Sequence, residues 1–245
     1  MLQHKVVSQN EWLDARKAFL PKEKDLTRRH DALNRERAEL PWVKLDKEYV
    51  FDSPQGKKTL GDLFDGKSQL LIYHFMFGPD WEQGCPSCSL AADTINSNLT
   101  HLTSRDISMA VISRAPIEKI EPFRKRMGWS FPWVSAHRSD FNQDFSVSFT
   151  PEQQNAGKNY NFGTIDFPID EAPGTSAFYR NEAGEIFHTY SSYARGGEGM
   201  LGVYALLDMA PKGRDEDGLS FPMAWVRHHD RYEKPAEHAC CAAQA

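Results

Sequence analysis

The strongest constraint on the fold is a long apolar run, QLLIYHFMF, at residues 69–77. It is rich in aromatic and β-branched residues and has no polar alternation, which is typical of a central parallel strand buried on both faces. A similar run, ISMAVIS, occupies residues 107–113, and FPWVSA at 131–136 predicts a further strand. Segments of helical length separate these runs. We therefore expect an α/β sheet in which strands 69–77 and 107–113 are adjacent and parallel.

Weaker patterns predict the other elements. Apolar residues mark one helical face between residues 117 and 127, and Pro122 within this stretch predicts a kink or a helix in two pieces. The remaining expected elements are an entry strand within 43–52, a helical turn at 59–64, a helix at 86–103, strands at 176–180 and 185–191 joined by the turn NEAG, and a final helix at 199–209.

The chain divides into expected parts of different character. Residues 1–43 predict an N-terminal helical arm, and residues 44–210 predict the main α/β domain. A polar, turn-rich stretch near 150–172 without clear periodicity reads as an insertion in that domain. Residues 211–245 read as a C-terminal extension that ends in a mobile tail.

The arm carries a narrow apolar stripe. After an expected helix break at Pro21, Leu26, Leu33 and Leu40 recur every seven residues among mixed charges. Such a stripe either packs on the protein's own domain or contributes to a homodimer.

Composition excludes two classes of partner. A net charge of −5 and a pI near 6.0 lack the basic field that nucleic-acid binding requires. No apolar run approaches the roughly eighteen residues of a membrane span, and the N-terminal MLQHKVVSQNEW has no apolar signal core. We therefore expect a cytoplasmic protein that binds neither nucleic acid nor membrane.

The cysteines carry the main functional signal. Cys85 and Cys88 form a C-P-S-C motif directly before the expected helix 86–103. In a reducing compartment this motif reads as redox or metal chemistry rather than as a structural disulfide. A helix N-terminus stabilises a thiolate at Cys85, and Pro86 suits the first helical turn. Cys88, one turn along, would be the resolving thiol. Zinc is less well supported, because it usually needs a second ligand pair.

The sequence around the motif resembles a known family. YHFMFGPDWEQGCPSCS, then VISRAPIEKIEPFRKRMGWSFPWVS, FHTYSSYARG and WVRHHDRYE are similar to a bacterial family of uncharacterised thioredoxin-like proteins, described as predicted dithiol–disulfide oxidoreductases. The similarity extends to about residue 233. It implies a thioredoxin-like fold related to the peroxiredoxin branch, with Cys85 and Cys88 in the positions of the redox pair.

One position departs from the thioredoxin pattern. Thioredoxins have a cis-proline before the strand that faces the C-x-x-C motif, whereas here Pro173 comes slightly too early and Thr175 and Ser176 follow Gly174. A hydroxyl of Thr175 or Ser176 would then face the thiols. This departure makes peroxide chemistry or metal capture more plausible.

Other side chains are weighed as supporting groups. Trp81 either walls the site or covers the helix surface, and Arg195 either supports an anion or forms a surface ion pair. His74 reads as a core histidine. His188 is the metal-ligand alternative beside Cys85 and Cys88. Tyr190 and Tyr193 lie in the same FHTYSSYAR segment.

The residue types of His228, His229 and Asp230 are those of metal ligands, but adjacent helical residues cannot all converge, and we favour docking of the terminal segment by Arg227, Asp230 and Arg231. The set His238, Cys240 and Cys241 reads either as a soft-metal or resolving-thiol site or as a disordered end.

The expected function is thiol–disulfide exchange, with Cys85 attacking a disulfide and Cys88 resolving the mixed disulfide. Two alternatives stay open: a thiol peroxidase, and a non-enzymatic copper- or zinc-binding protein that uses Cys85, Cys88 and His188. The partner would be a protein or small-molecule disulfide, or a peroxide. No organic cofactor is expected, because the sequence contains no glycine-rich nucleotide-binding motif.

Overall fold

A computed structural model describes residues 4–233 of the chain, which divides into two compact units, Met1–Val43 and Lys44–Ala245. The first unit is built on α1 (Gln9–Ala38), whose N-terminus is closed by a capping box between Ser8 and Glu11. The expected break at Pro21 is wrong, because α1 continues through it. Only one backbone donor is lost there, and the flanking residues are strong helix formers.

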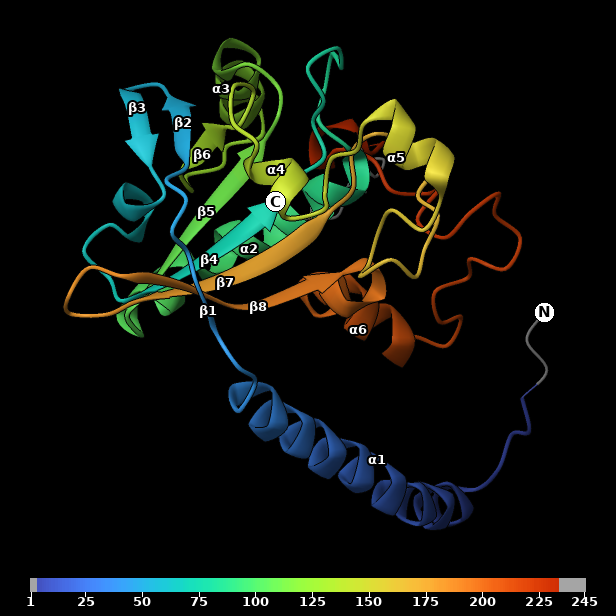
Figure 1. The fold of residues 1–245 in the computed structure, drawn as a ribbon. Helices are drawn as coiled ribbons and strands as arrows, with labels where there is room; N and C mark the ends of the chain where they lie inside the picture. Colours follow the sequence, from blue (N-terminus) through green and yellow to red (C-terminus); the bar gives the residue numbers. More distant parts are fainter. Residues whose placement is uncertain (1–3, 234–245) are drawn as a thin grey trace, which may run out of the picture. The chain divides into compact units, whose positions relative to one another are not determined.

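The second unit is built around one mixed β-sheet (Figure 1). β1 (Val43–Lys44) spans the boundary between the units. The strands that follow are β2 (Val50–Ser53), β3 (Gly56–Thr59), β4 (Gln69–His74), β5 (Ile107–Ser113), β6 (Trp133–Ser135), β7 (Gly174–Arg180) and β8 (Ile186–Tyr193). They lie in the order β8-β7-β4-β5-β6-β2-β3.

The central strands have the predicted relationship. β4 and β5 are adjacent and parallel, in a register that runs from Gln69↔Ile107 to His74↔Ile112. β6 continues the parallel part next to β5, whereas β7 is antiparallel to β4 and forms a hairpin with β8. The prediction for strands 69–77 and 107–113 is therefore confirmed.

The helices of the second unit are η1 (Gly61–Phe64), α2 (Pro86–Ser104), α3 (Ile117–Arg126), α4 (Phe141–Asp144), α5 (Pro151–Ala156), η2 (Ala194–Met200), α6 (Gly202–Met209) and η3 (His229–Arg231). They differ from the sequence predictions in two places. α3 is one helix despite Pro122, because Ile120 and Phe123 on either side of it are anchored in the same core. The final helix is divided into η2 and α6, since the glycines of η2 weaken α-helix there.

Alternation along β4 assigns the two faces of the sheet. Tyr73 and Phe75 belong to a core shared with α2 and α3, which we call the cysteine face because Cys88 lies in it. Leu70 and Ile72 belong to a second core with η1 and α4, which we call the histidine face because the His74 ring stacks on Phe141 there. Helices on both faces and a βαβ unit followed by a β-hairpin define a thioredoxin-like α/β fold, as expected.

A buried polar chain crosses the histidine face. His74 Nε2 lies 2.9 Å from the Ser176 hydroxyl, which lies 2.8 Å from the Ser191 hydroxyl, and His188 Nε2 lies 2.8 Å from Ser191. Burial, with a smaller contribution from His188, lowers the pKa of His74 to about 3. This hydrogen-bonded row of side chains is therefore neutral near pH 7, and it links β4, β7 and β8.

A largely buried ion pair ties the segment before β7 to the end of β5. The Arg114 guanidinium pairs with Glu171, which is 1% exposed, and lies 3.0 Å from Asp170. The Ser148 hydroxyl donates to Glu171 at 2.9 Å. Burial raises the pKa of Glu171 to about 7 against the opposing effect of Arg114. These contacts determine where the chain enters β7.

In the described part of the chain, every helix is too short or too polar to span a bilayer.

Replacing the central hydroxyl of the polar chain should destabilise the fold. Ser176→Ala leaves His74 and Ser191 without their shared partner in a fully buried position, at a cost of about 1–3 kcal/mol. Urea denaturation of this variant and of Ser97→Ala, on the exposed surface of α2, measures the difference. Equal losses in the two variants would contradict a structural role for the chain.

Candidate redox site

Cys85 lies where the strand–loop–helix unit turns into α2. It is the N-cap residue of that helix, and Pro86 occupies the first turn. The Cys85 amide donates to the Met76 carbonyl at 3.0 Å, and the Cys85 carbonyl accepts from the Ser89 amide and hydroxyl, both at 2.9 Å. The backbone on both sides of the thiol is therefore hydrogen-bonded, which holds Cys85 at the helix N-terminus.

The loop that precedes Cys85 is held by packing. A Cβ on Gly84 would lie 2.5 Å from the Phe75 ring and 2.8 Å from the Phe123 ring, so a side chain does not fit there without movement. Trp81 covers Gly78 in the same loop, where a Cβ would lie 2.9 Å from the Trp81 indole nitrogen. Trp81 also packs against the cysteine-face core, which is compatible with both interpretations of this residue.

The C-terminal segment docks onto this loop. His228 Nε2 donates to the Gly84 carbonyl at 2.8 Å, and Arg126 lies 3.2 Å from the other nitrogen of His228. Asp230 accepts two hydrogen bonds from Arg126, both at 2.8 Å. Burial lowers the pKa of His228, so it is neutral near pH 7. Arg227 bonds to carbonyls within its own segment instead.

The pKa values of the two thiols are shifted in opposite directions. Hydrogen bonding from Cys88, with smaller contributions from the backbone amides of Cys88 and Ser87, lowers the pKa of Cys85 to about 7 despite partial burial. Burial raises the pKa of Cys88 well above its ordinary value, and hydrogen bonding to Cys85 adds to this effect. A hydrogen bond from Tyr73 opposes the rise. Cys85 is partly exposed and Cys88 is 2% exposed. Cys85 is therefore the more exposed and the more acidic of the two thiols.

The hydroxyl residues of β7 point to opposite faces. Thr175 pairs with Tyr73 across the sheet and lines the same cavity as Cys88. Ser176 lies on the histidine face, in the polar chain with His74. Of the two hydroxyls expected to face the thiols, only Thr175 is on the side of Cys88.

The metal-ligand alternative is not assembled. His188 packs against Phe145 and Phe178 on the histidine face, with the sheet between it and the cysteines. Across residues 4–233, no group of three or more His, Cys, Asp or Glu side chains is arranged to hold a metal ion. The expected set of Cys85, Cys88 and His188 is therefore wrong, because strand alternation turns His188 away. His238, Cys240 and Cys241 lie outside the described residues.

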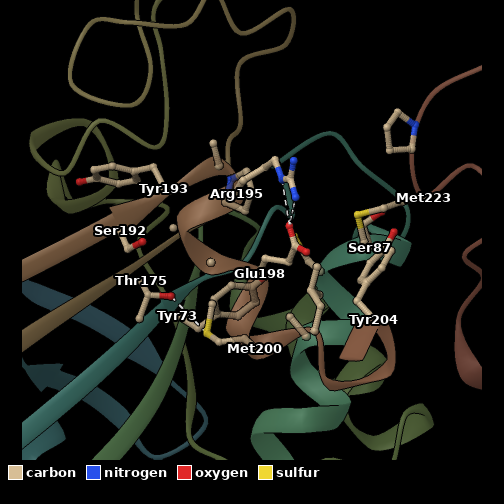
Figure 2. Close-up of a pocket in the computed structure, with 18 of the residues that line it drawn as sticks. Tyr73, Ser87, Thr175, Ser192, Tyr193, Arg195, Glu198, Met200, Tyr204 and Met223 are labelled. Carbon is tan, nitrogen blue, oxygen red and sulfur yellow. Dashed lines mark hydrogen bonds and ion pairs between the residues drawn. The ribbon is translucent and has the colours of Figure 1, made fainter. Parts of the chain in front are cut away.

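A cavity of about 460 Å³ opens beside Cys88. Cys88 and Ser87 contribute to its lining from α2, and Tyr73 and Thr175 from the sheet. Figure 2 shows Thr175 and Ser192 on one side, Ser87, Tyr204 and Met223 on the other, and Met200 between them. We call this space the Cys88 cavity. Arg195 lines it too, and its exposed guanidinium pairs with Glu198 at 2.8 Å, as the surface alternative predicted.

Sequence reasoning missed two residues at this site. Tyr73 was hidden in an apolar run, although alternation from Phe75 would have directed it to the cysteine face. His228 was considered only as a metal ligand, and no local pattern indicates its bond to Gly84.

The rate of Cys85 alkylation by iodoacetamide should rise with pH through a midpoint near 7 and level off above it. The reason is that lowering the pKa of an acid moves its ionisation to lower pH. In Cys88→Ala the donor is lost and the midpoint should move upward. Rates measured over a pH series in both proteins check this, and a wild-type midpoint at an ordinary thiol value of ~8.5 would contradict it.

Adding a methyl group beneath the loop should destabilise the fold. Gly84→Ala forces the loop away from Phe75 and Phe123, at a cost of about 1–3 kcal/mol. Gly218→Ala is the matched control, since nothing lies within 4 Å of a Cβ there. Denaturant unfolding measures the free energy of unfolding of both variants. Equal values would show that the loop moves to accommodate the methyl group at no cost, which would contradict the prediction.

Comparison with solved structures shows distant similarity. One is a peroxidoxin, BcpB, from Mycobacterium tuberculosis, with 12% identity and a TM-score of 0.46, over 66% of this chain and 94% of that one. Another is a mutant of peroxiredoxin Q from Xanthomonas campestris, with 16% identity and a TM-score of 0.46, over 70% and 98%. A third is StoA from Bacillus subtilis, with 14% identity and a TM-score of 0.36, over 61% and 89%.

Sequence comparison is more decisive. No curated protein matches the chain. The profile of one family, described as bacterial protein of unknown function (DUF899), matches residues 1–232. This range covers the helical arm, the thioredoxin-like domain and the docked C-terminal segment, and the chain therefore belongs to the DUF899 family.

Proposed function

We propose that this protein is a thiol–disulfide oxidoreductase in which Cys85 attacks and Cys88 resolves. The observation that carries the proposal is the asymmetry of the pair: a partly exposed thiol with a lowered pKa at a helix N-terminus, next to a buried thiol with a raised pKa. At pH 7 about half of Cys85 is thiolate, against a few per cent of an ordinary cysteine.

The proposed reaction transfers two electrons. The Cys85 thiolate attacks one sulfur of a disulfide RSSR, forms a Cys85–SR mixed disulfide and expels RS⁻, which takes up a proton. Cys88 then loses its proton and attacks the Cys85 sulfur, and the second RSH leaves. The pair becomes a disulfide and RSSR becomes two thiols. An external dithiol reductant returns the pair to its starting state.

Tyr73 supports the second step. It is 3% exposed, its hydroxyl hydrogen-bonds to Cys88, and both residues line the Cys88 cavity. Burial of Cys88 opposes the deprotonation that resolution requires, and this hydrogen bond favours the thiolate. Tyr73 is thus a positioning and stabilising group for the resolving thiol. We also propose a cytoplasmic location, where cellular thiols keep such a pair reduced.

Substitution of each cysteine should have different consequences. Cys88→Ser should accumulate a mixed disulfide between Cys85 and its substrate, because the intermediate forms and no buried thiol displaces it. Cys85→Ser should accumulate none, since the attacking thiolate is absent. Non-reducing electrophoresis and mass spectrometry of both variants, recovered from acid-quenched cells, measure the adducts.

Equal trapping by both variants, or trapping by neither, would contradict the proposal. Hydrogen peroxide consumption by the reduced wild-type protein provides the complementary measurement. Rapid consumption without any mixed disulfide would indicate the peroxidase alternative, in which Cys85 becomes a sulfenic acid and condenses with Cys88.

A further inference from the structure

We infer that the Cys88 cavity binds a small, neutral organic disulfide, and that this is the substrate class of the redox pair. The inference rests on the proposed function and narrows its substrate from disulfides in general. The observations that carry it are the lining of the cavity, the pairing of its charged groups and its position beside the thiols.

The lining is apolar and adaptable. Met76, Met200 and Met223 approach from three different segments, and Leu201 and Tyr204 add to the surface. Methionine side chains are flexible and fit irregular apolar ligands. A space of about 460 Å³ is within the range of small-molecule sites. It accommodates an organic substituent but not a folded protein.

The charged groups at the cavity already have partners within the protein. Arg195 pairs with Glu198 at 2.8 Å, and Arg214 pairs with Glu198 and, at 2.7 Å, with Asp208. One oxygen of Glu216 accepts from the Tyr204 hydroxyl and the Trp225 indole, both at 2.6 Å, and from the Met223 amide at 2.9 Å.

The two arginines of the lining, Arg195 and Arg214, offset its two glutamates, Glu198 and Glu216, so a charged ligand gains no net attraction there. A neutral ligand keeps the existing contacts and gains apolar burial, worth roughly 25 cal/mol per Å². The charge distribution thus selects against carboxylate- or ammonium-bearing disulfides.

The chemistry would occur where the cavity meets α2, whose lining residues are Ser87, Cys88 and Ala91. Cys85 is not part of the lining, but its sulfur accepts a hydrogen bond from the thiol of Cys88, which is part of it. A disulfide whose organic group fills the cavity thus has its sulfur atoms beside the pair. After attack by Cys85 the bound group remains in the cavity as the mixed disulfide, until Cys88 displaces it as a thiol.

The test compares two disulfides of equal size in single turnovers of the reduced full-length protein. Dipropyl disulfide is neutral, and cystamine carries an ammonium group where dipropyl disulfide has each terminal methyl. Each rate is divided by the rate of free dithiothreitol with the same disulfide, which removes intrinsic reactivity. We expect the normalised rate to be at least ~10-fold higher for dipropyl disulfide, since pocket contacts of this kind discriminate by about 10–200-fold.

A cavity-filling variant identifies where this preference arises. Met200→Trp occupies the space and should abolish the preference, whereas Met209→Trp, on a residue that is 75% exposed, should retain it. Met223→Trp fills the opposite wall and replaces Met200→Trp if that variant does not fold by circular dichroism. Alkylation of Cys85 by iodoacetamide reports on the thiolate independently of the cavity.

The outcomes separate the two proposals. Equal normalised rates for both disulfides, or a preference that survives in both cavity-filling variants, would overturn the inference and leave the oxidoreductase function standing. Failure of the reduced protein to react with either disulfide would also overturn the inference, whereas the proposed function itself falls only if Cys88→Ser traps no mixed disulfide either.

Discussion

The strict alternation of side chains along β4 is the constraint on which the rest of the domain depends. Because both faces of this central strand are covered, each residue is committed to one of two cores. Tyr73 is directed to the Cys88 thiol, and His74, the next residue, is directed to the polar chain on the other face. A slip of one residue would exchange them, burying a histidine beside the thiols and a tyrosine among the phenylalanines.

Much of the fold was predictable from local patterns. Strands 69–77 and 107–113 are continuous apolar runs, and a buried parallel pair is the arrangement that satisfies both. The behaviour of Pro21 and Pro122 was not predictable in the same way. Proline weakens a helix locally, but whether the helix breaks depends on what holds its two halves. For Pro122 that is the packing of Ile120 and Phe123, a tertiary contact that no local pattern contains.

The site was predictable only in part, for a similar reason. The C-P-S-C motif and its helix are local in sequence, so the cysteine positions followed from the pattern. His188 is far from them in sequence, and only the register of β7 and β8 reveals that it faces away. Thr175 and Ser176 show the same limit, since neighbouring hydroxyls are equivalent until strand pairing assigns their faces. The cavity could not be predicted, because part of its lining comes from the C-terminal segment, whose sequence has no periodic pattern.

The neutrality of the buried histidines has a consequence for the reduction potential of the cysteine pair. With the pKa values of His74 and His228 both lowered, neither ring changes charge near pH 7. In the proposed redox pair, the potential then varies with pH through the protons of the two thiols and not through these two rings. Below the pKa of Cys85, reduction takes up two protons with two electrons, and the potential falls by about 59 mV per pH unit. Above it Cys85 remains a thiolate, and the slope halves to about 30 mV. As the pH rises above neutrality, the pair therefore continues to become a stronger reductant, but its potential falls by less for each pH unit than it does below neutrality.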